Sequence, residues 1–444
     1  MIGMNRIRWV LVCGLAILAA LWLAPHAQIL FLRELFAMRH EWVLLTGLVA
    51  FAAMAGAVML SMRPVAVEPP MGGLDKMYRL HKWLGVTALV VAVLHWLWIK
   101  APKWAAGWGW IVRPPKGARP QLEGMEAFFR QQRGLAETMG EWGFYALIVL
   151  VLIALVQRVP YGYFRNTHRL MAVIALVFCW HAVVLTEYSD WSKPVGWLTA
   201  ALVVGCVVGS IVGLTGRIGR RRRVPARITQ LEPFRQNRVL KVVLKLDKPW
   251  PGHQTGQFAF VTFDPREGAH PFTISSAWKG DGSIYFLIKG VGDYTSRLAQ
   301  TLQVGGMATV EGPYGDFRFA GPEKWQIWIG AGIGITPFIA RMQALAVEPD
   351  GRQIDLFYVT QLPDPTFVER VQKHAKAAGV TMHLHVKGRD PRLTADVIRE
   401  MLPDWHEASI WFCGPAGMGD ELQAAMQKTG LDPAAFHREF FQMR

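Results

Sequence analysis

Cysteine is scarce in this chain, with four residues among 444. Cys13, Cys179 and Cys206 lie in apolar runs, and Cys413 lies in the second half. No two of them form a CxxC pair, which excludes zinc-ribbon and iron–sulfur signatures and a disulfide framework. Any metal centre in this protein must therefore be held by ligands other than thiolates.

Acidic residues are scarce in the first half only. Residues 1–223 contain 24 Lys and Arg against 10 Asp and Glu, a net charge of +14, whereas residues 224–444 contain 24 against 23. The first half is also strongly apolar, so its basic excess indicates topology signals beside a bilayer and not a nucleic-acid-binding surface. The second half has the charge balance of an ordinary soluble region.

Long apolar stretches dominate the first half. Six have spanning length or close to it, at residues 8–24, 42–62, 81–99, 141–157, 168–187 and 194–215. We therefore expect a six-helix transmembrane bundle. A signal peptide is the alternative for the first stretch, because Arg6 and Arg8 precede it.

Basic residues predict the orientation of this bundle. The segments 63–82 and 158–169 and the run Arg220–Arg223 fall on the same side of a six-span chain as its N-terminus. The positive-inside rule makes that side cytoplasmic. The basic loop expected over residues 100–140 falls on the other face, where glutamates partly offset its charge.

Four histidines lie inside these apolar stretches. His81 and His95 are 14 residues apart on one stretch, and His168 and His181 are 13 apart on another. On helices these spacings correspond to ~21 and ~20 Å of depth, so His81 pairs with His168 at one level and His95 with His181 at the other. Histidine in a membrane span indicates function by default, and imidazole is a common axial haem ligand. The pattern predicts two stacked bis-histidine haems, whereas His26 and His40 near loop ends are expected to be ordinary histidines.

The second half begins with alternating apolar residues over about 239–261, punctuated by Gly and Pro, which predicts a small antiparallel β-barrel. The run His270-Pro271-Phe272-Thr273-Ile274-Ser275-Ser276 follows. Phe272 offers a ring to stack on a flavin, and Thr273 and Ser276 offer hydroxyl donors. Next, Lys289 to Arg297 place flexible glycines before a helix start, a pattern that seats a diphosphate but also fits any capped helix.

From residue 321 the pattern changes to alternating strands and helices, which predicts a parallel sheet. The strand 325–329 runs into Gly330-Ala331-Gly332-Ile333-Gly334-Ile335-Thr336-Pro337, a dinucleotide-type turn without a full GxGxxG. Strands at 354–359 and 410–412 follow, and the last runs into Cys413-Gly414-Pro415 at a strand end, where ligands bind in open sheets. A buried core thiol is the alternative for Cys413.

Together these segments resemble the ferric reductase/NADPH oxidase superfamily over essentially the whole chain. The resemblance implies a transmembrane haem-binding domain at 1–220, an FAD-binding β-barrel domain at 224–320 and an NAD(P)-binding α/β domain at 321–444. It implies the haem-iron ligands His81, His95, His168 and His181. It implies FAD contacts at His270, Pro271, Phe272, Thr273, Ser276, Lys289, Gly290, Gly292, Thr295, Ser296 and the terminal aromatic Phe441. It implies NAD(P) contacts at Gly330, Gly332, Gly334, Ile335, Thr336, Pro337, Cys413, Gly414 and Pro415, with Cys413 and Phe441 taking part in the hydride step.

Two positions depart from this pattern. Eukaryotic superoxide-forming members carry a second histidine one turn after the outer ligand, where this chain has Ile99. NADPH-preferring members often place Arg soon after the second dinucleotide strand, whereas here Thr360-Gln361-Leu362-Pro363 follows and the nearest basic candidates are Arg389 and Arg392. The acceptor and the choice between NADH and NADPH therefore stay open.

The resemblance implies a multi-pass protein of a bacterial-type cytoplasmic membrane. It would pass electrons from cytoplasmic NAD(P)H through FAD and two b-type haems to oxygen or a ferric chelate outside. An electron donor to a periplasmic partner or quinone is one alternative. A six-span transporter or channel with a nucleotide-sensing domain, its histidines serving as a proton relay, is another.

Overall fold

The computed structural model describes residues 2–27, 34–112, 122–156 and 158–439. Its contacts separate two compact units. Of the described residues, the helical unit contains those in the ranges 4–67 and 76–218, and the sheet unit contains 2–3, 68–75 and 219–439. Each unit is described by itself below.

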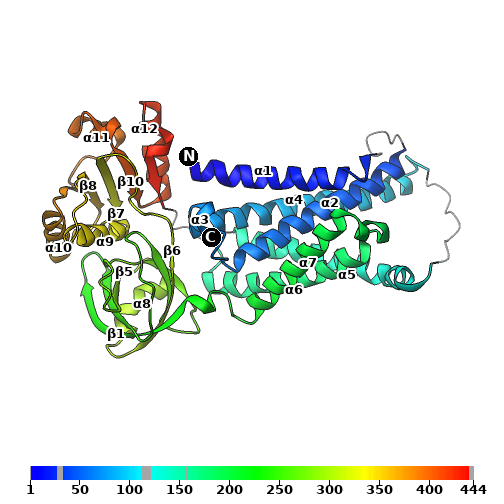
Figure 1. The fold of residues 1–444 in the computed structure, drawn as a ribbon, viewed down its shortest axis with the longest axis horizontal. Helices are drawn as coiled ribbons and strands as arrows, with labels where there is room; N and C mark the ends of the chain where they lie inside the picture. The colour runs from blue at the N-terminus through cyan, green and yellow to red at the C-terminus, as the bar shows by residue number, and fades with distance from the viewer. Residues whose placement is uncertain (1, 28–33, 113–121, 157, 440–444) are drawn as a thin grey trace. The chain divides into compact units, whose positions relative to one another are not determined.

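The helical unit is built from long apolar helices that run alongside one another (Figure 1). They are α1 (Ile2–Leu23), α2 (Leu35–Ser61), α4 (Leu74–Gly107), α5 (Gly124–Leu155), α6 (Tyr161–Leu185) and α7 (Pro194–Leu214). Within the described residues, five of these helices are long and apolar enough to cross a membrane. The apolar part of α1, Ile7–Leu23, is shorter than these five. The protein is therefore a multi-pass membrane protein, and the length criterion supports five of the six expected spans.

The basic loop expected over residues 100–140 is mostly helical. Helix α4 continues to Gly107 with Pro102 inside it, and α5 already begins at Gly124. The expectation was wrong because charged residues such as Lys100 and Arg130 end an apolar run without ending a helix. Lys and Arg are good helix formers.

Small residues bring α2 and α7 close together. A Cβ on Gly205 would lie 2.7 Å from Met59 Sδ, and one on Gly209 would lie 2.7 Å from Val58 Cγ1. Such contacts are typical of membrane helices, which associate through close packing of small residues. Cys179 of α6 and Cys206 of α7 are buried in the same cluster, which fixes α6 against this helix pair.

The first part of the sheet unit is a six-stranded antiparallel sheet in the order β4-β3-β6-β1-β2-β5. Its strands are β1 (Arg223–Phe234), β2 (Val239–Leu246), β3 (Phe258–Thr262), β4 (His270–Thr273), β5 (Ser283–Lys289) and β6 (Met307–Tyr314). The edge strands β4 and β5 are joined only by one bridge, Ile274 to Phe286. The expected closed barrel is therefore not formed, because the short β4 offers too few backbone groups for a ladder with β5.

The second part is a five-stranded sheet in the order β11-β10-β7-β8-β9, in which every pair is parallel. The expected strands are present as β7 (Trp325–Ala331), β8 (Gln353–Thr360) and β10 (Ser409–Cys413). Two further strands, β9 (Thr381–Val386) and β11 (Phe436–Arg438), were missed. β11 is three residues long, which is too short to show an alternating pattern.

Helices cover both faces of this parallel sheet (Figure 1). Residues of α9 (Thr336–Leu345) and α10 (Pro365–Ala377) pack on the face that carries Trp328 and Trp411. Residues of α11 (Ala395–Met401) and α12 (Ala416–Lys428) pack on the opposite face. The first of these cores also contains residues of the antiparallel sheet, such as Phe234 and Leu287, so the two sheets share one hydrophobic core.

The end of the segment between α2 and α4, from Glu68 onward, belongs to the sheet unit. Its short helix α3 (Glu68–Met71) begins at Glu68, whose carboxylate accepts hydrogen bonds from Arg222 (3.1 Å) and from the Gly315 amide (2.9 Å). The Arg222 guanidinium also lies 4.7 Å from the centroid of the Tyr314 ring. Glu68 is thus held by charge-assisted hydrogen bonds to Arg222, just before β1, and to the turn after β6.

An ion pair joins the two sheets. Arg370 of α10 donates hydrogen bonds of 2.6 and 2.7 Å to the two carboxylate oxygens of Glu232 on β1. The guanidinium also lies 5.2 Å from the centroid of the Phe234 ring. These hydrogen bonds hold the pKa of Glu232 below the usual range of a carboxyl.

We predict that this pair makes the stability of the sheet unit depend on pH. A depressed carboxyl pKa contributes stability above the unfolded-state pKa, and this contribution is lost as pH falls through the folded-state pKa. Because the two side chains are 36% and 27% exposed, we expect a coupling of about 1 kcal/mol. A double-mutant cycle of Glu232→Gln and Arg370→Met, with the exposed Lys248→Met as control, should give this coupling near neutral pH and none in acid. An equal coupling at both pH values would contradict the prediction.

Candidate functional site

The four histidines of the helical unit meet in two pairs. His81 of α4 faces His168 of α6 with ring centroids 5.9 Å apart, and His95 faces His181 with centroids 6.4 Å apart. A metal–imidazole bond is about 2 Å long, so two imidazoles on opposite sides of one metal ion have centroids roughly 6 Å apart. Both pairs therefore have the spacing that a bis-histidine metal centre requires.

Hydrogen bonds to backbone carbonyls orient three of these rings. Nδ1–H of His81 donates to the Ala57 carbonyl (2.8 Å), that of His95 to the Val43 carbonyl (3.0 Å) and that of His181 to the Ala136 carbonyl (2.8 Å). A ring that donates from Nδ1 keeps its lone pair on Nε2 for a metal, and such outer partners are the rule for metal-ligating histidines.

The fourth ring is held differently. His168 Nδ1 is buried and has no hydrogen-bond partner among the described residues. Its ring instead stacks on Phe164, one turn earlier on α6, with centroids 5.1 Å apart. At the level of His95 and His181 both rings are held by hydrogen bonds to carbonyls, whereas at the level of His81 and His168 one ring is held by aromatic stacking.

Glycines leave room for the pair formed by His95 and His181. A Cβ on Gly140 of α5 would lie 2.2 Å from His181 Nδ1, and a Cβ on Gly47 of α2 would lie 3.1 Å from His95 Cε1. Larger residues at these positions would push the imidazoles out of place. Sequence analysis missed both glycines, because the helix that each one contacts is only known from the fold.

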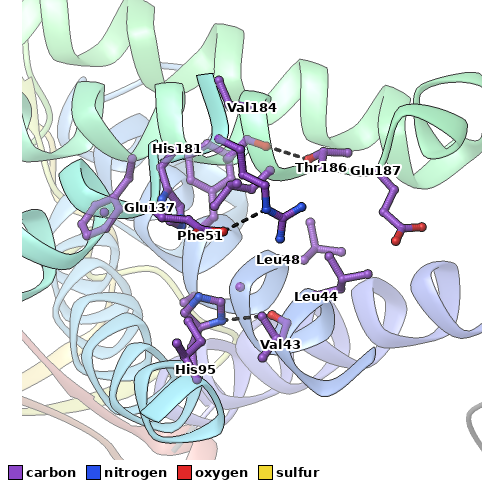
Figure 2. A pocket seen from close by; sticks show the side chains of 18 of the residues that line it. Val43, Leu44, Leu48, Phe51, His95, Glu137, His181, Val184, Thr186 and Glu187 are labelled. Atoms are coloured by element: carbon purple, nitrogen blue, oxygen red, sulfur yellow. Dashed lines mark hydrogen bonds and ion pairs between the residues drawn. The ribbon is translucent and has the colours of Figure 1, made fainter. Parts of the chain in front are cut away.

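A pocket of about 730 Å³ surrounds this histidine pair. Figure 2 shows His95 and His181 in this pocket, with Glu137 near His181 and Glu187 at the far end beyond Thr186. The apolar lining includes Leu44, Leu48, Phe51, Phe144 and Val184. Its charged lining contains five cations, Arg39, Lys100, Lys103, Arg130 and Arg133, and four carboxylates, Glu126, Glu137, Glu141 and Glu187. Lys100 pairs with Glu141 and Arg133 pairs with Glu137. A flat apolar group with acidic substituents, such as a haem with its propionates, fits this combination of apolar walls, facing imidazoles and cations.

In the sheet unit, the flavin segment predicted at residues 270–276 lies on β4 and the turn that follows it. The His270 ring stacks on Tyr294 of α8 (Asp293–Thr301), with centroids 4.5 Å apart. Phe272, beside Pro271 on β4, is half-buried, and Thr273 and Ser276 are buried. The Ser276 hydroxyl already accepts a hydrogen bond from the Tyr285 amide. The fold therefore joins the two predicted flavin segments through Tyr294, which sequence analysis did not select.

The predicted diphosphate turn leads into α8. The amides of Val291 and Gly292 both donate to Thr295 Oγ1 at 3.1 Å. These two amide groups therefore find their hydrogen-bond acceptor in the N-terminal cap of the helix. Gly290 packs against Ser296, where a Cβ would lie 3.1 Å from its Cα. Thr295 and Ser296 thus shape the turn.

The two predicted nucleotide segments are brought together by adjacent strands. β7 and β10 pair in parallel with Cys413 opposite Gly330. A Cβ on Gly334 would lie 2.1 Å from the Cys413 carbonyl oxygen and 3.0 Å from the Gly414 amide nitrogen. The glycine-rich turn therefore rests backbone to backbone on Cys413 and Gly414. Ile335 is buried at the end of the short helix η4 (Gly332–Ile335). Thr336 and Pro337 are buried in the first turn of α9. Pro415 directly precedes α12.

Lys289 connects the flavin segment with this turn. Gly332 has a φ of +59°, and a Cβ placed on it would lie 3.7 Å from Lys289 Nζ. The end of β5 thus places an ammonium group beside the glycine-rich turn, which suits an anionic nucleotide.

Cys413 is fully buried in the core of the parallel sheet. Burial and the nearby Glu439 carboxylate raise the pKa of its thiol, so the side chain is an uncharged thiol at neutral pH. Glu439 was missed by sequence analysis. The other predicted residue of this step, Phe441, lies outside the described residues.

Two parts of the chain match known families. Residues 46–179 match the family "Ferric reductase like transmembrane component", and residues 225–318 match the family "FAD-binding domain". The first match contains His81, His95 and His168 and ends two residues before His181. The second begins within β1 and extends beyond β6.

Curated relatives match less than half of the chain. The reductase component of propane 2-monooxygenase from Rhodococcus jostii is 25% identical over 47% of this chain and 60% of its own length. Dual oxidase 2 of Rattus norvegicus is 25% identical over 36% of this chain and 14% of its own length. Respiratory burst oxidase homolog protein E of Arabidopsis thaliana is 27% identical, over 43% and 22%. The chain thus spans less than two thirds of these relatives.

Among solved structures, the ferredoxin reductase of carbazole 1,9a-dioxygenase aligns with 49% of this chain and 69% of its own, at 20% identity and a TM-score of 0.42. Phthalate dioxygenase reductase aligns with 50% and 68%, at 19% identity and a TM-score of 0.42. The ferric reductase match on the histidine-bearing helices and the FAD-binding match, together with the oxidase relatives, lead to one conclusion: the chain is an oxidoreductase that combines a ferric reductase-like transmembrane domain with an FAD-binding domain and has NADPH oxidases among its homologues.

Proposed function

We propose that this protein passes electrons from cytoplasmic NAD(P)H across the membrane to an acceptor on the outer face, using FAD and two b-type haems. The single observation that carries this proposal is the pair of histidine–histidine separations, 5.9 and 6.4 Å, inside apolar helices. The proposal keeps the domain limits 1–220, 224–320 and 321–444 and six spans. It also keeps the orientation in which Arg220–Arg223 and the sheet unit are cytoplasmic, in a bacterial-type cytoplasmic membrane.

When bound, the flavin supplies the conversion of a two-electron hydride into single electrons, which haem iron carries. The protein's own residues supply position. His81 with His168, and His95 with His181, would hold one haem each, and the backbone carbonyls of α2 and α5 keep three Nε2 atoms available. Phe272, Thr273 and Ser276 would contact the flavin ring, and the turns at 290–296 and 330–337 would contact the phosphate groups.

The proposed nicotinamide contact is Cys413. Its side chain is a small, uncharged thiol, buried at the end of β10, and the turn from Gly330 to Gly334 packs directly against its backbone carbonyl. Arg389 and Arg392, the nearest candidates for a 2′-phosphate contact, form ion pairs with Asp390 and Glu421. Neither arginine therefore decides between the two nucleotides, and the proposal keeps both NADH and NADPH as donors.

For the acceptor, we propose oxygen, which would give superoxide, or a ferric chelate. Ile99 lines the pocket beside His95 in place of the histidine of superoxide-forming relatives. Lys103 and Arg130 line the same pocket beside four carboxylates and are the groups that would contact an anionic chelate. Transfer to a periplasmic partner or quinone is the second candidate, and a proton-relay transporter is the third.

The haem ligands make a spectroscopic prediction. His95→Ala and His181→Ala should each lose one of two haems, halving the haem-to-protein ratio, and should abolish reduction of the outer acceptor while FAD content is unchanged. His406→Ala, an exposed histidine of the sheet unit, is the matched control. Full haem content in both pair variants would refute the ligand assignment, and a wild-type protein without a b-type Soret band would favour the transporter.

The acceptor is identified by turnover with NADH or NADPH. Oxidase activity predicts dye reduction that superoxide dismutase suppresses, whereas ferric-chelate reductase activity predicts ferrous product at an undiminished rate in its presence. If neither oxygen nor a ferric chelate accelerates NAD(P)H oxidation, both acceptors are wrong and the partner or quinone route is favoured.

Gly334 provides a test of the nucleotide turn. In Gly334→Ala the added methyl group collides with the Cys413 carbonyl, so the turn must move. We expect the KM for NAD(P)H to rise at least about tenfold, a loss of about 1.4 kcal/mol, with FAD content retained. Gly417→Ala on α12, where a Cβ meets nothing within 4 Å, is the control. A KM equal to that of the control would remove this turn from the nucleotide site.

A further inference from the structure

A second group of metal-ligating side chains lies in the helical unit, apart from the paired histidines. His26 follows α1, whereas Glu187 and Asp190 lie in the connection between α6 and α7. One ligand atom from each of the three lies within 4.8 Å of the other two. His26 and Asp190 are 4% and 5% exposed, so two of the three ligands are almost fully buried.

The His26 ring presents a lone pair to Asp190. Nδ1–H of His26 donates to the Trp22 carbonyl at 3.0 Å, and the ring stacks on the Trp22 indole with centroids 4.6 Å apart. In the neutral imidazole, Nε2 is then an acceptor, and it lies 3.5 Å from Asp190 Oδ2. This separation exceeds the 2.7–2.9 Å range typical of a charge-assisted hydrogen bond. Two buried electron-pair donors therefore face one another with a gap between them.

The gap has the size of a coordination edge. Zinc–nitrogen and zinc–oxygen bonds are about 2.1 Å long, so two ligands of a tetrahedral ion lie about 3.4 Å apart. The Nδ1 hydrogen bond of His26 to a backbone carbonyl is the outer-shell partner usual for a metal-ligating histidine.

Both carboxylates keep an oxygen for a cation. Lys193 Nζ lies 2.7 Å from Asp190 Oδ1, which leaves Oδ2 on the side of His26. His40 Nε2 lies 2.7 Å from Glu187 Oε1, which leaves Glu187 Oε2 without this contact. Lys193 and His40 thus each contact one oxygen of a carboxylate. One imidazole nitrogen and one oxygen of each carboxylate are left for an ion.

The cluster communicates with the pocket described above. Glu187 and His40 both line the pocket that contains His95 and His181, and Glu187 lies at its far end (Figure 2). Glu187 is therefore the ligand of this cluster that also lines the pocket.

We propose that His26, Glu187 and Asp190 form a binding site for a divalent first-row transition-metal ion, with His40 and Lys193 as positioning residues. One imidazole and two carboxylates favour Zn²⁺, Fe²⁺ or Mn²⁺ over thiolate-preferring ions. The inference concerns ion binding alone and holds whichever acceptor the protein reduces.

Zinc binding to the purified full-length protein tests this site. After chelator treatment and equilibrium dialysis against Zn²⁺, the wild type should retain one equivalent that His26→Gln and Glu187→Gln lose, with at least tenfold weaker binding. Zinc absorption-edge spectroscopy should show nitrogen and oxygen ligands at about 2.0–2.2 Å. His406→Gln in the sheet unit is the matched control.

Haem content and the thermal midpoint of each variant distinguish loss of the ion from loss of the fold. The proposal is overturned if His26→Gln with full haem content binds zinc like the wild type. It is also overturned if the wild type retains no zinc. If His26→Gln fails to fold, Glu187→Gln decides, since this side chain lies at the more exposed end of the cluster. Normal zinc binding in a protein without electron-transfer activity would refute the proposed function and leave this site standing.

Discussion

The helical unit depends on one constraint: an imidazole in an apolar helix must find a partner for each of its two ring nitrogens. Three of the four paired histidines meet this constraint for Nδ1 with a backbone carbonyl, from Val43, Ala57 or Ala136. Since carbonyls only accept, each Nδ1 carries the proton and each Nε2 is left as a ligand atom. The choice of tautomer, the direction of the lone pair and the spacing within each pair thus follow from how α2 and α5 lie against α4 and α6.

The need to position these imidazoles also explains where glycines lie in the helical unit. Gly47 and Gly140 lie against the His95 and His181 rings because any side chain there would occupy the imidazole's place. Gly205 and Gly209 let α7 approach α2, and this contact in turn supports α6. In a bilayer, where helix association relies on close packing, these glycines fix the positions of the ligands without touching a cofactor.

In the sheet unit, backbone contacts position the predicted flavin and nucleotide segments. Parallel pairing of β7 with β10 sets Gly334 directly on the Cys413 carbonyl, and β5 ends with Lys289 beside Gly332. Segments distant in the chain, at 270–276, 289–296, 330–337 and 413–415, are gathered by two sheets that share one core. Glu68 adds the connection between α2 and α4 to this arrangement through Arg222 and the Gly315 amide.

Much of this organisation follows from local pattern. Apolar length predicted the helices, period and Gly-Pro punctuation predicted the strands, and the spacing of His81, His95, His168 and His181 predicted which rings share a level. What the sequence could not determine are contacts between distant segments: the stacking of His270 on Tyr294, the absence of a closed barrel, and the approach of His26 to Asp190. His26 and Asp190 are separated by 164 positions, and no periodicity relates them. Such pairs depend on the rotation and tilt of each element against its neighbours, and side-chain packing in the folded chain decides both.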